Sequence, residues 1–428
     1  MRRIIILGLS VLVLLLACTT QTKETESPQI LNQKANTAYQ NQDYSAWLWY
    51  MKRLYAISPY SPFTTYNLAC AYSLNGFPAK ALEALEKSIS MGIGVNADRD
   101  PDFGSLKELT EFQELMTRAE ALNQPVSNST EAFTVNELDL IPEGITYNPI
   151  DGTFFIGSLY KSKIIKVDIN GQASDFTAER QDGLRPVTGM KINPDRTELW
   201  ACSQVSSPGN RNHDPSEMGW SGIFKYDLNT GKLIKKYTLF EEELPHLFND
   251  LVILKNGDVY FTDSTTGSIY RIRKIQDKIE LFLRSGEFTY PNGIALSPDQ
   301  KNLYMAGTLQ GVVLVNIQDG TYKPLEHPDG VTTVGIDGLY HYKNSLIAVQ
   351  NGLGRISRFY LNQAGDKILH SELIEFANPV FNIPTTGTIV GNTFYYLANS
   401  QLRSFEADGT IFPPERLANV VVLKTELQ

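Results

Sequence analysis

The stretch from Pro291 to Ala306 (P-N-G-I-A-L-S-P-D-Q-K-N-L-Y-M-A) is the part of the sequence that best indicates the fold. It opens on a polar residue and a glycine, runs into a short apolar segment, turns through Ser-Pro-Asp, and continues as a second segment rich in aliphatic and aromatic side chains. Short segments of this kind between Gly, Pro, Asn and Asp are typical of antiparallel β-strands. The stretch therefore predicts two neighbouring strands of one sheet.

The same opening recurs along residues 133–428 at intervals of 45, 61, 43 and 45 residues. The recurring pairs are Glu143-Gly144, Thr188-Gly189, Asn249-Asp250, Asn292-Gly293 and Asp337-Gly338, with a sixth start near Pro384-Thr385. Units of about 40–50 residues with four strands each are the blades of a β-propeller. We therefore predict a mostly β protein with a six-bladed β-propeller over 133–428. The long interval predicts an exposed loop over 203–221 in the second blade.

The repeated openings also predict a ring of side chains, because the first strand of each propeller blade lines the central channel. The ring consists of Glu143, Thr188, Asn249, Asn292, Asp337 and Thr385 or a neighbour. Carboxylates that converge on one axis repel each other unless a cation lies between them. A set made only of oxygen ligands suits a hard ion such as Ca²⁺, and a ring without His or Cys argues against structural zinc. The alternative is that these residues cap strand ends and bind water.

Four motifs connect this ring to a known family. They are Pro142-Glu143-Gly144-Ile145, Phe248-Asn249-Asp250, Pro291-Asn292-Gly293-Ile294 and Ile336-Asp337-Gly338. Together they resemble the regucalcin/gluconolactonase-like (SMP-30/LRE-like) propellers and, more distantly, diisopropyl-fluorophosphatase and the paraoxonases.

The resemblance implies that four residues ligate one divalent cation, most simply Ca²⁺: Glu143, Asn249, Asn292 and Asp337. Such a cation would polarise a lactone carbonyl or a phosphoryl oxygen and help to activate water. The resemblance also implies that Asp337 is the general base or nucleophile, and that the substrate is a lactone or another small ester.

Two positions depart from the family pattern. Gluconolactonases carry an arginine that grips a sugar acid, whereas the residue two before Asn249 is Leu247. Paraoxonases carry a catalytic histidine near the channel mouth, whereas the second blade opens on Thr188. Thr188 and His246 are therefore our candidates for the channel mouth, although we favour a solvated loop position for His246. These departures keep a second function open, namely a non-catalytic, metal-stabilised propeller that binds a partner as a scaffold.

The amino terminus predicts export. Arg2 and Arg3 precede an apolar run over 4–17, which is too short for a bilayer core of about 20 residues and is typical of a secretory signal peptide. The run ends in Leu-Leu-Ala before Cys18, which resembles the lipobox of bacterial lipoproteins; an ordinary signal peptide with a chance cysteine is the alternative. The resemblance implies removal of 1–17, lipidation of Cys18, a tether over 18–29 and anchoring to a membrane of the cell envelope. Thr19 favours the outer membrane and leaves the leaflet open.

Residues 30–122 have helical spacing, and Ala38-Tyr39 and Ala71-Tyr72 repeat at an offset of 33 residues. This period resembles tetratricopeptide (TPR) repeats. We predict a TPR-like helical module that acts as a spacer or docking lid, with a protein partner as the alternative. The polar stretch 123–132 is then a linker.

Composition excludes one class of function. The formal net charge of −9 would repel nucleic acid, and no basic run offsets it. Besides Cys18, the chain holds Cys70 and Cys202, one in the helical module and one in the propeller. Two such residues give no disulfide framework, and we expect both to be buried free thiols.

Overall fold

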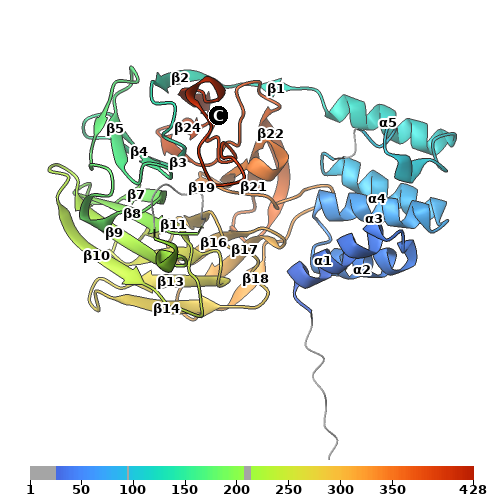
Figure 1. Cartoon of the computed structure of the whole chain (residues 1–428), viewed down its shortest axis with the longest axis horizontal. Helices are drawn as coiled ribbons and strands as arrows, with labels where there is room; N and C mark the ends of the chain where they lie inside the picture. The colour runs from blue at the N-terminus through green and yellow to red at the C-terminus, as the bar shows by residue number, and fades with distance from the viewer. Residues whose placement is uncertain (1–25, 94–95, 207–213) are drawn as a thin grey trace, which may run out of the picture.

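The computed structural model describes residues 26–93, 96–206 and 214–428, which form a β-propeller with a helical module beside it (Figure 1). The predicted signal peptide and Cys18 lie outside these residues. Among the helices of the described ranges, none combines the length and the apolar character needed to cross a membrane.

Six antiparallel sheets surround one axis, which confirms the predicted six-bladed propeller. In the first three blades the strands are β3 (Pro142–Asn148), β4 (Thr153–Ser158), β5 (Ile164–Val167) and β6 (Ala173–Asp175); β7 (Val187–Ile192), β8 (Glu198–Gln204), β9 (Ser221–Asp227) and β10 (Leu233–Leu239); and β11 (Phe248–Ile253), β12 (Val259–Asp263), β13 (Ser268–Ile272) and β14 (Ile279–Arg284). In the last three they are β15 (Ile294–Leu296), β16 (Asn302–Gly307), β17 (Gly311–Asn316) and β18 (Tyr322–Pro324); β19 (Leu339–Tyr342), β20 (Ser345–Gln350), β21 (Arg355–Leu361) and β22 (Ile368–Phe376); and β23 (Gly387–Val390), β24 (Thr393–Leu397) and β25 (Val420–Glu426).

The sixth blade takes its outer strand from the other end of the propeller sequence. Strand β2 (Thr130–Val135) pairs antiparallel with β25, Val135 opposite Val420, so the ring is closed by both ends of the chain. Strand β1 (Val126–Ser127) covers the outer edge of the fifth blade beside β22. Residues 123–132, for which we predicted a linker, therefore contain β1 and the beginning of β2. Pairing satisfies edge groups that an open ring would leave exposed.

The insertion of the second blade differs from the prediction at its two ends. Ser203 and Gln204 belong to β8 and are buried, and Ser221 opens β9. The backbone N–H of Val205 donates to the carbonyl oxygen of Trp220 at 2.9 Å. The hairpin therefore extends into the segment predicted as an exposed loop.

The helical module contains two helix pairs and a last helix. They are α1 (Pro28–Gln40) with α2 (Tyr44–Ile57), α3 (Pro62–Leu74) with α4 (Pro78–Ser90), and α5 (Thr110–Leu122), which follows a short 3-10 turn, η1 (Pro101–Phe103). Ser27, Asp43 and Ser61 cap the first three helices with their side chains. Fully buried Ala69, Ala71 and Ala81 let the paired helices approach closely. The module thus has its own core, and its assignment to the TPR family stays a prediction.

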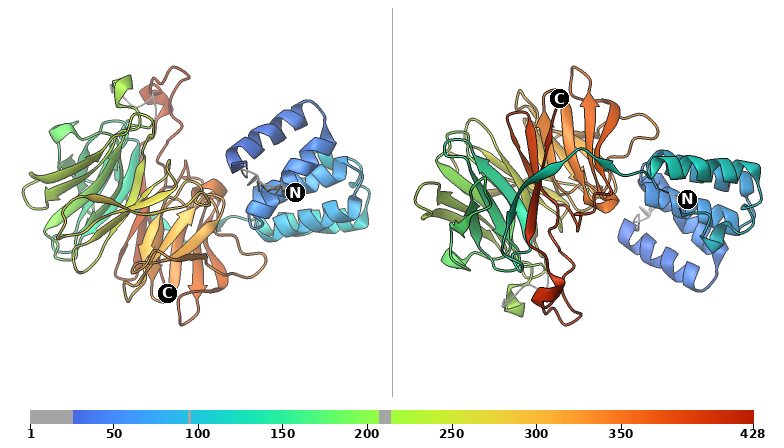
Figure 2. Two further views of the ribbon diagram at one scale, coloured as in Figure 1. Left: turned by 90° about the horizontal axis from the view of Figure 1, so that it is seen from below. Right: turned by 90° about the horizontal axis from the view of Figure 1, so that it is seen from above.

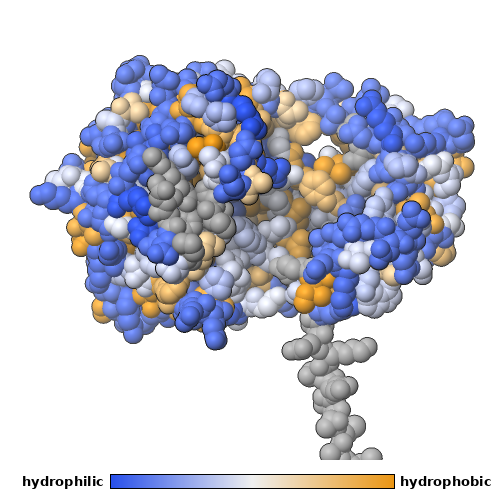
Figure 3. All heavy atoms as spheres, viewed as in Figure 1, coloured by the Kyte–Doolittle hydropathy of each residue, from blue (hydrophilic) through white to orange (hydrophobic). Residues whose placement is uncertain are grey.

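The helical module lies beside the propeller (Figure 2), and its contacts are with the end of the propeller where the inner strands begin. It contacts the loops β16–β17, β18–β19 and β20–β21, which lie at that end because successive strands of a blade alternate in direction. The Thr332 hydroxyl donates to the Tyr60 carbonyl oxygen at 2.7 Å, and the Tyr60 ring lies edge-on to the His327 ring, 4.2 Å between centroids. In the space-filling view, hydrophobic residues gather in the hollow between module and propeller (Figure 3).

We expect Arg355→Met to loosen this docking. The Arg355 guanidinium donates to the Met91 carbonyl oxygen at 3.3 Å and to Gln350 Oε1 at 2.9 Å, and burial lowers its pKa to about 10. Its loss removes the donor to the Met91 carbonyl oxygen, whereas Gln350 Oε1 keeps the Ser357 hydroxyl as a donor, and an unsatisfied buried acceptor costs about 1–3 kcal/mol. Hydrogen exchange should therefore accelerate at the backbone amides of 91–93. Arg416→Met, which removes an exposed pair with Glu406, should leave that exchange unchanged, and equal exchange in both variants would contradict the expectation.

Candidate metal centre

The six ring residues lie where the inner strands begin. Glu143, Thr188 and Asn249 are the second residues of β3, β7 and β11. The other three, Asn292, Asp337 and Thr385, each lie two residues before an inner strand. All are buried except Asn292, which is half-buried. The inner strands surround the axis in Figure 1, so the sequence period does translate into a ring at one end of the channel.

Asp337 is held by two amide side chains. Asn292 Nδ2 donates to its Oδ1 at 2.8 Å, and Asn351 Nδ2 donates to its Oδ2 at 2.6 Å. Burial raises the pKa of Asp337 to about 7, the two amides oppose this rise, and the nearby Asp250 carboxylate adds to it. Asn351, which follows β20, was missed by sequence reasoning because it lies outside the repeated opening.

Glu143 has a buried carboxylate oxygen without a partner. Its Oε2 has no hydrogen bond to any described residue, although the side chain is fully enclosed. Burial first, and then the Asp337 and Asp250 carboxylates, raise the pKa of Glu143 well above its usual range. A buried, unsatisfied carboxylate beside two others is costly unless a cation compensates it. The donor set of this ring therefore fits a hard divalent cation.

Both ring asparagines use their amide nitrogens in hydrogen bonds. Asn249 Nδ2 donates to Ser264 Oγ at 3.0 Å, and Asn292 Nδ2 donates to Asp337. Because each amide nitrogen is already used, the amide oxygen is the atom left to a cation. Ser264 in turn donates to the Pro291 carbonyl oxygen at 2.6 Å. This bond fixes the backbone directly before Asn292.

Residues 141–340 match the family described as SMP-30/Gluconolactonase/LRE-like region. The matched range contains all four predicted ligands of the ring. No curated protein matches the chain.

Several solved structures are similar to this propeller. A gluconolactonase from Xanthomonas campestris is 14% identical, with 72% of this chain and 93% of that chain covered and a TM-score of 0.47. A calcium-binding regucalcin from Agrobacterium tumefaciens is 16% identical, covering 70% and 93%, with a TM-score of 0.47. A virginiamycin B lyase from Staphylococcus aureus is 18% identical, covering 61% and 79%, with a TM-score of 0.44. At such identities a likeness concerns the fold alone.

The ring threonines donate their hydroxyl groups to backbone carbonyl oxygens of neighbouring blades. Thr188 Oγ1 donates to the Phe248 carbonyl oxygen at 2.8 Å, and Thr385 Oγ1 donates to the Glu143 carbonyl oxygen at 3.2 Å. Both hydroxyls therefore tie one inner strand to the next. The hydroxyl of Thr188, our candidate for the channel mouth, is thus engaged with the Phe248 carbonyl oxygen of the next blade.

His246 lies in the interior of the third blade, so the prediction of a solvated loop histidine is wrong. The residue is 1% exposed, and its Nδ1 lies 2.6 Å from Asp263 Oδ2. The imidazole packs against the rings of Phe248 and Tyr270. Its side chain is therefore enclosed by these rings and by Asp263. Asp263, which lies 17 positions later in the sequence, supplies the buried partner of the imidazole.

Tyr290 is a further residue of the site that the sequence did not indicate. It precedes the Pro291-Asn292 motif, has a left-handed backbone (φ 52°), and is 45% exposed. Burial of its hydroxyl, together with the Asp337 and Glu143 carboxylates, raises its pKa to about 12. Tyr290 therefore lies within the electrostatic influence of both ring carboxylates.

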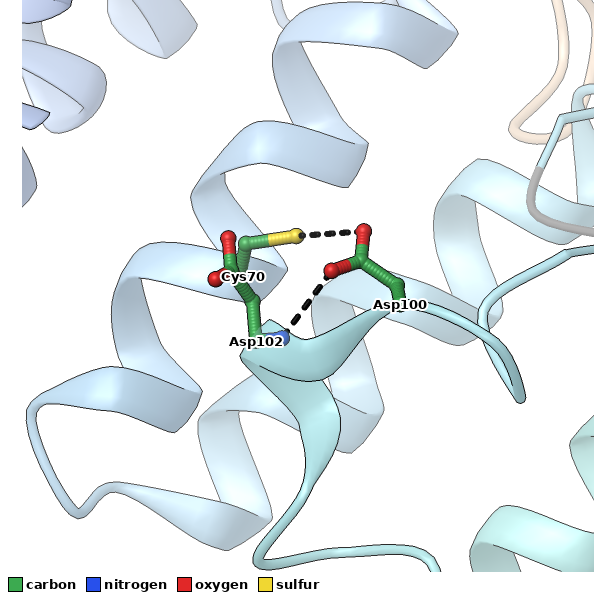
Figure 4. A group of neighbouring side chains, drawn as sticks. All are labelled: Cys70, Asp100 and Asp102. Atoms are coloured by element: carbon green, nitrogen blue, oxygen red, sulfur yellow. Dashed lines mark hydrogen bonds between the residues drawn. The ribbon is translucent and has the colours of Figure 1, made fainter. Parts of the chain in front are cut away.

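A second cluster, Cys70 with Asp100 and Asp102, lies in the helical module (Figure 4). Its ligand atoms lie within 4.8 Å of one another, but hydrogen bonds already occupy them. Tyr66 donates to Asp100 at 2.8 Å, Cys70 Sγ lies 3.9 Å from the same oxygen, and burial raises the pKa of the thiol. A metal would need the thiolate, so this cluster secures η1 on α3 instead. Cys70 and Cys202 are both free and buried, as predicted.

We expect the metal-free protein to lose stability as the pH rises through neutrality. Asp337 has a pKa near 3.8 in an unfolded chain and about 7 in the fold, so between these values the folded state holds a proton that the unfolded state has lost. Stability therefore falls with rising pH in this window. The check is urea unfolding in a chelator at pH 5 and pH 8, where Asp337→Asn should show a smaller fall. A wild-type fall no larger than that of the variant would contradict the assignment.

Proposed function

We propose that this chain is a cell-envelope lipoprotein whose propeller is a divalent-metal-dependent hydrolase of a lactone or a similar small ester. The observation that supports it best is the unpartnered, buried carboxylate oxygen of Glu143 beside Asp337 in the ring. A buried pair of carboxylates with two amide oxygens is a set of donors that suits a hard divalent cation. Calcium is the preferred ion because all four donors are hard oxygens.

The proposed ligands are Glu143, Asn249, Asn292 and Asp337, and a cation held there would supply Lewis-acid polarisation of a carbonyl oxygen. Asp337 is the proposed proton acceptor, because it is a buried carboxylate of the ring. Asn351 and Asn292 orient its two oxygens. Tyr290 is the proposed contact for the body of the substrate at the entrance.

The test uses the chain from residue 18 onward, stripped with a chelator and assayed on a panel of lactones and aryl esters. We expect hydrolysis to disappear on stripping and to return with Ca²⁺. Mg²⁺, Mn²⁺ and Zn²⁺ are added separately to identify the preferred ion. Hydrolysis that persists in the stripped protein would overturn the proposal.

A second candidate is the metal-stabilised, non-catalytic scaffold. Leu247 is buried where gluconolactonases carry their arginine, and Thr188 is bound to backbone where paraoxonases carry a histidine. If Ca²⁺ raises the melting temperature but no compound of the panel turns over, the scaffold function is the better account, with the helical module as the surface for a protein partner.

The anchor has its own test. Cys18→Ala removes the thiol that lipidation requires, so we expect the variant to move from the membrane fraction to the soluble fraction of the cell envelope. Fractionation of cells that express either form measures this. Thr19→Ala is the control and should stay with the membrane. Membrane retention of Cys18→Ala would count against the lipoprotein assignment.

A further inference from the structure

The channel contains a cation of its own, Lys191, which the repeated motifs did not indicate. Lys191 belongs to β7, three residues beyond the ring residue Thr188. Its Nζ lies 3.1 Å from Asp250 Oδ1 and 5.5 Å from the centroid of the Tyr340 ring. Asp250 follows the ring residue Asn249 and is almost fully buried. A lysine and a carboxylate thus form an ion pair directly beyond the proposed metal ring.

The charges that act inside the channel come from a small set of side chains. The charged side chains that interact with Glu143 are Asp337, Asp250 and Lys191, and Lys191 is paired with Asp250. Three carboxylates and one ammonium leave two negative charges when all are ionised. A buried net charge must be compensated, and two negative charges match one divalent cation.

Asp250 is held away from the ring by its own contacts. Its Oδ1 accepts from Lys191 and from the backbone N–H of Leu251 at 2.9 Å, and its Oδ2 accepts from the backbone N–H of Ile294 at 3.4 Å. Lys191 and two backbone N–H groups therefore already supply donors to both carboxylate oxygens of Asp250.

The other end of the channel supplies no alternative partner for Lys191. A cavity of about 350 Å³ opens there, lined by later residues of all six inner strands, among them Ile145, Val252, Ile294 and Ile389. Its described lining is mainly apolar and includes no acidic residue. The apolar wall accommodates the methylene stem of Lys191, while the ammonium reaches back to Asp250.

We propose that Lys191 sets the charge of the channel, so that the ring accepts one divalent cation and Asp250 stays outside its coordination shell. This inference rests on the proposed metal site. Lys191 is a positioning residue, because it acts on the cation through Asp250 and through its charge.

The test measures ion selectivity by competition between Tb³⁺ and Ca²⁺, followed by Tb³⁺ luminescence. Lys191→Met leaves three uncompensated carboxylates, which favour a trivalent ion. We expect its preference for Tb³⁺ over Ca²⁺ to rise about tenfold or more, the size expected for removing one unit charge about 10 Å away at an effective dielectric constant of about 20. Lys191→Arg keeps the charge and should retain the wild-type preference.

Two further variants separate charge from packing. Lys191→Met combined with Asp250→Asn restores two negative charges and should restore the wild-type preference. Asp250→Asn alone removes a negative charge and should shift the preference towards Ca²⁺, which keeps the test valid if Lys191→Met does not fold.

Lys225→Met is the matched control. Lys225 belongs to β9 of the same blade, with Nζ 2.7 Å from Glu198 Oε1 and 5.0 Å from the Trp200 ring centroid. Its side chain is 21% exposed, against 25% for Lys191, but it lies two strands farther from the channel. It should leave the preference unchanged.

The outcomes are distinct for the inference and for the proposed function. The inference is overturned if Lys191→Met and Lys225→Met behave alike, or if the double variant keeps the shifted preference. If the wild-type protein binds neither ion, the proposed metal site fails and the inference fails with it. Hydrolysis is not needed for any of these measurements.

Discussion

Asp337→Asn is expected to lower metal-dependent hydrolysis about a thousandfold and to abolish the thermal stabilisation by Ca²⁺. The substitution keeps the shape of the side chain but removes a buried negative charge from the ring and the proposed proton acceptor. Loss of several kcal/mol of charge stabilisation corresponds to a rate factor of about 10³. The measurements are kcat/KM on the best substrate at a Ca²⁺ concentration that saturates the wild-type protein, and melting temperatures with Ca²⁺ and with a chelator.

A damaged fold would give a different result from a lost ligand. Because burial raises the pKa of Asp337, its ionised form destabilises the metal-free protein, so metal-free Asp337→Asn should melt at a higher temperature than metal-free wild type at pH 8. Asp299→Asn, in an exposed turn of the fourth blade, is the control. It should change neither kcat/KM nor the increase in melting temperature that Ca²⁺ causes. Unchanged Ca²⁺ stabilisation in Asp337→Asn would remove Asp337 from the ligand set.

The sequence period was sufficient to predict the six blades, because each blade repeats one local pattern of strands and turns. It could not predict how the ring closes. Val135 pairs with Val420, and no local signal links residues so far apart in the chain. The short segment of β2 also follows a polar stretch with a proline, which favoured a linker over a strand. Closure is therefore a property of the whole ring rather than of any one segment.

The candidate site could be predicted only as far as it repeats. The ring residues occupy matched positions, so an alignment of the blades finds them. Asn351, Tyr290 and Lys191 occur at unmatched positions, and their importance depends on which side chain they meet. Lys191, for example, reads as an ordinary polar residue of a strand until Asp250 of the next blade is placed beside it.

The glycines of the repeated openings are also only partly explained by the sequence. The motif contains them, but it does not show why a glycine is required there. Gly144, Gly189, Gly293 and Gly338 lie where neighbouring inner strands approach most closely. A Cβ on Gly144 would lie 2.0 Å from the Thr188 carbonyl oxygen, and one on Gly293 would lie 2.3 Å from the Asp337 carbonyl oxygen and 2.7 Å from the Leu339 nitrogen. Backbone atoms cannot yield as a flexible side chain can, so close approach rather than a special φ requires these glycines.

Gly293→Ala is therefore expected to destabilise the protein by about 3 kcal/mol and to weaken Ca²⁺ binding about tenfold. The methyl group must push β19 away from β15, which costs folding free energy and moves the Asp337 backbone out of the ring. Urea unfolding measures the first effect, and calorimetric titration of the folded variant with Ca²⁺ measures the second.

Gly286→Ala is the matched control for this substitution. Gly286 lies in an exposed turn of the same part of the chain, where a Cβ would meet nothing within 4 Å, so its replacement should change stability by no more than about 0.5 kcal/mol. If Gly293→Ala loses stability but binds Ca²⁺ as wild type does, the contact between β15 and β19 supports the fold without positioning Asp337. If both properties are lost together, the spacing of the inner strands is itself part of the metal centre.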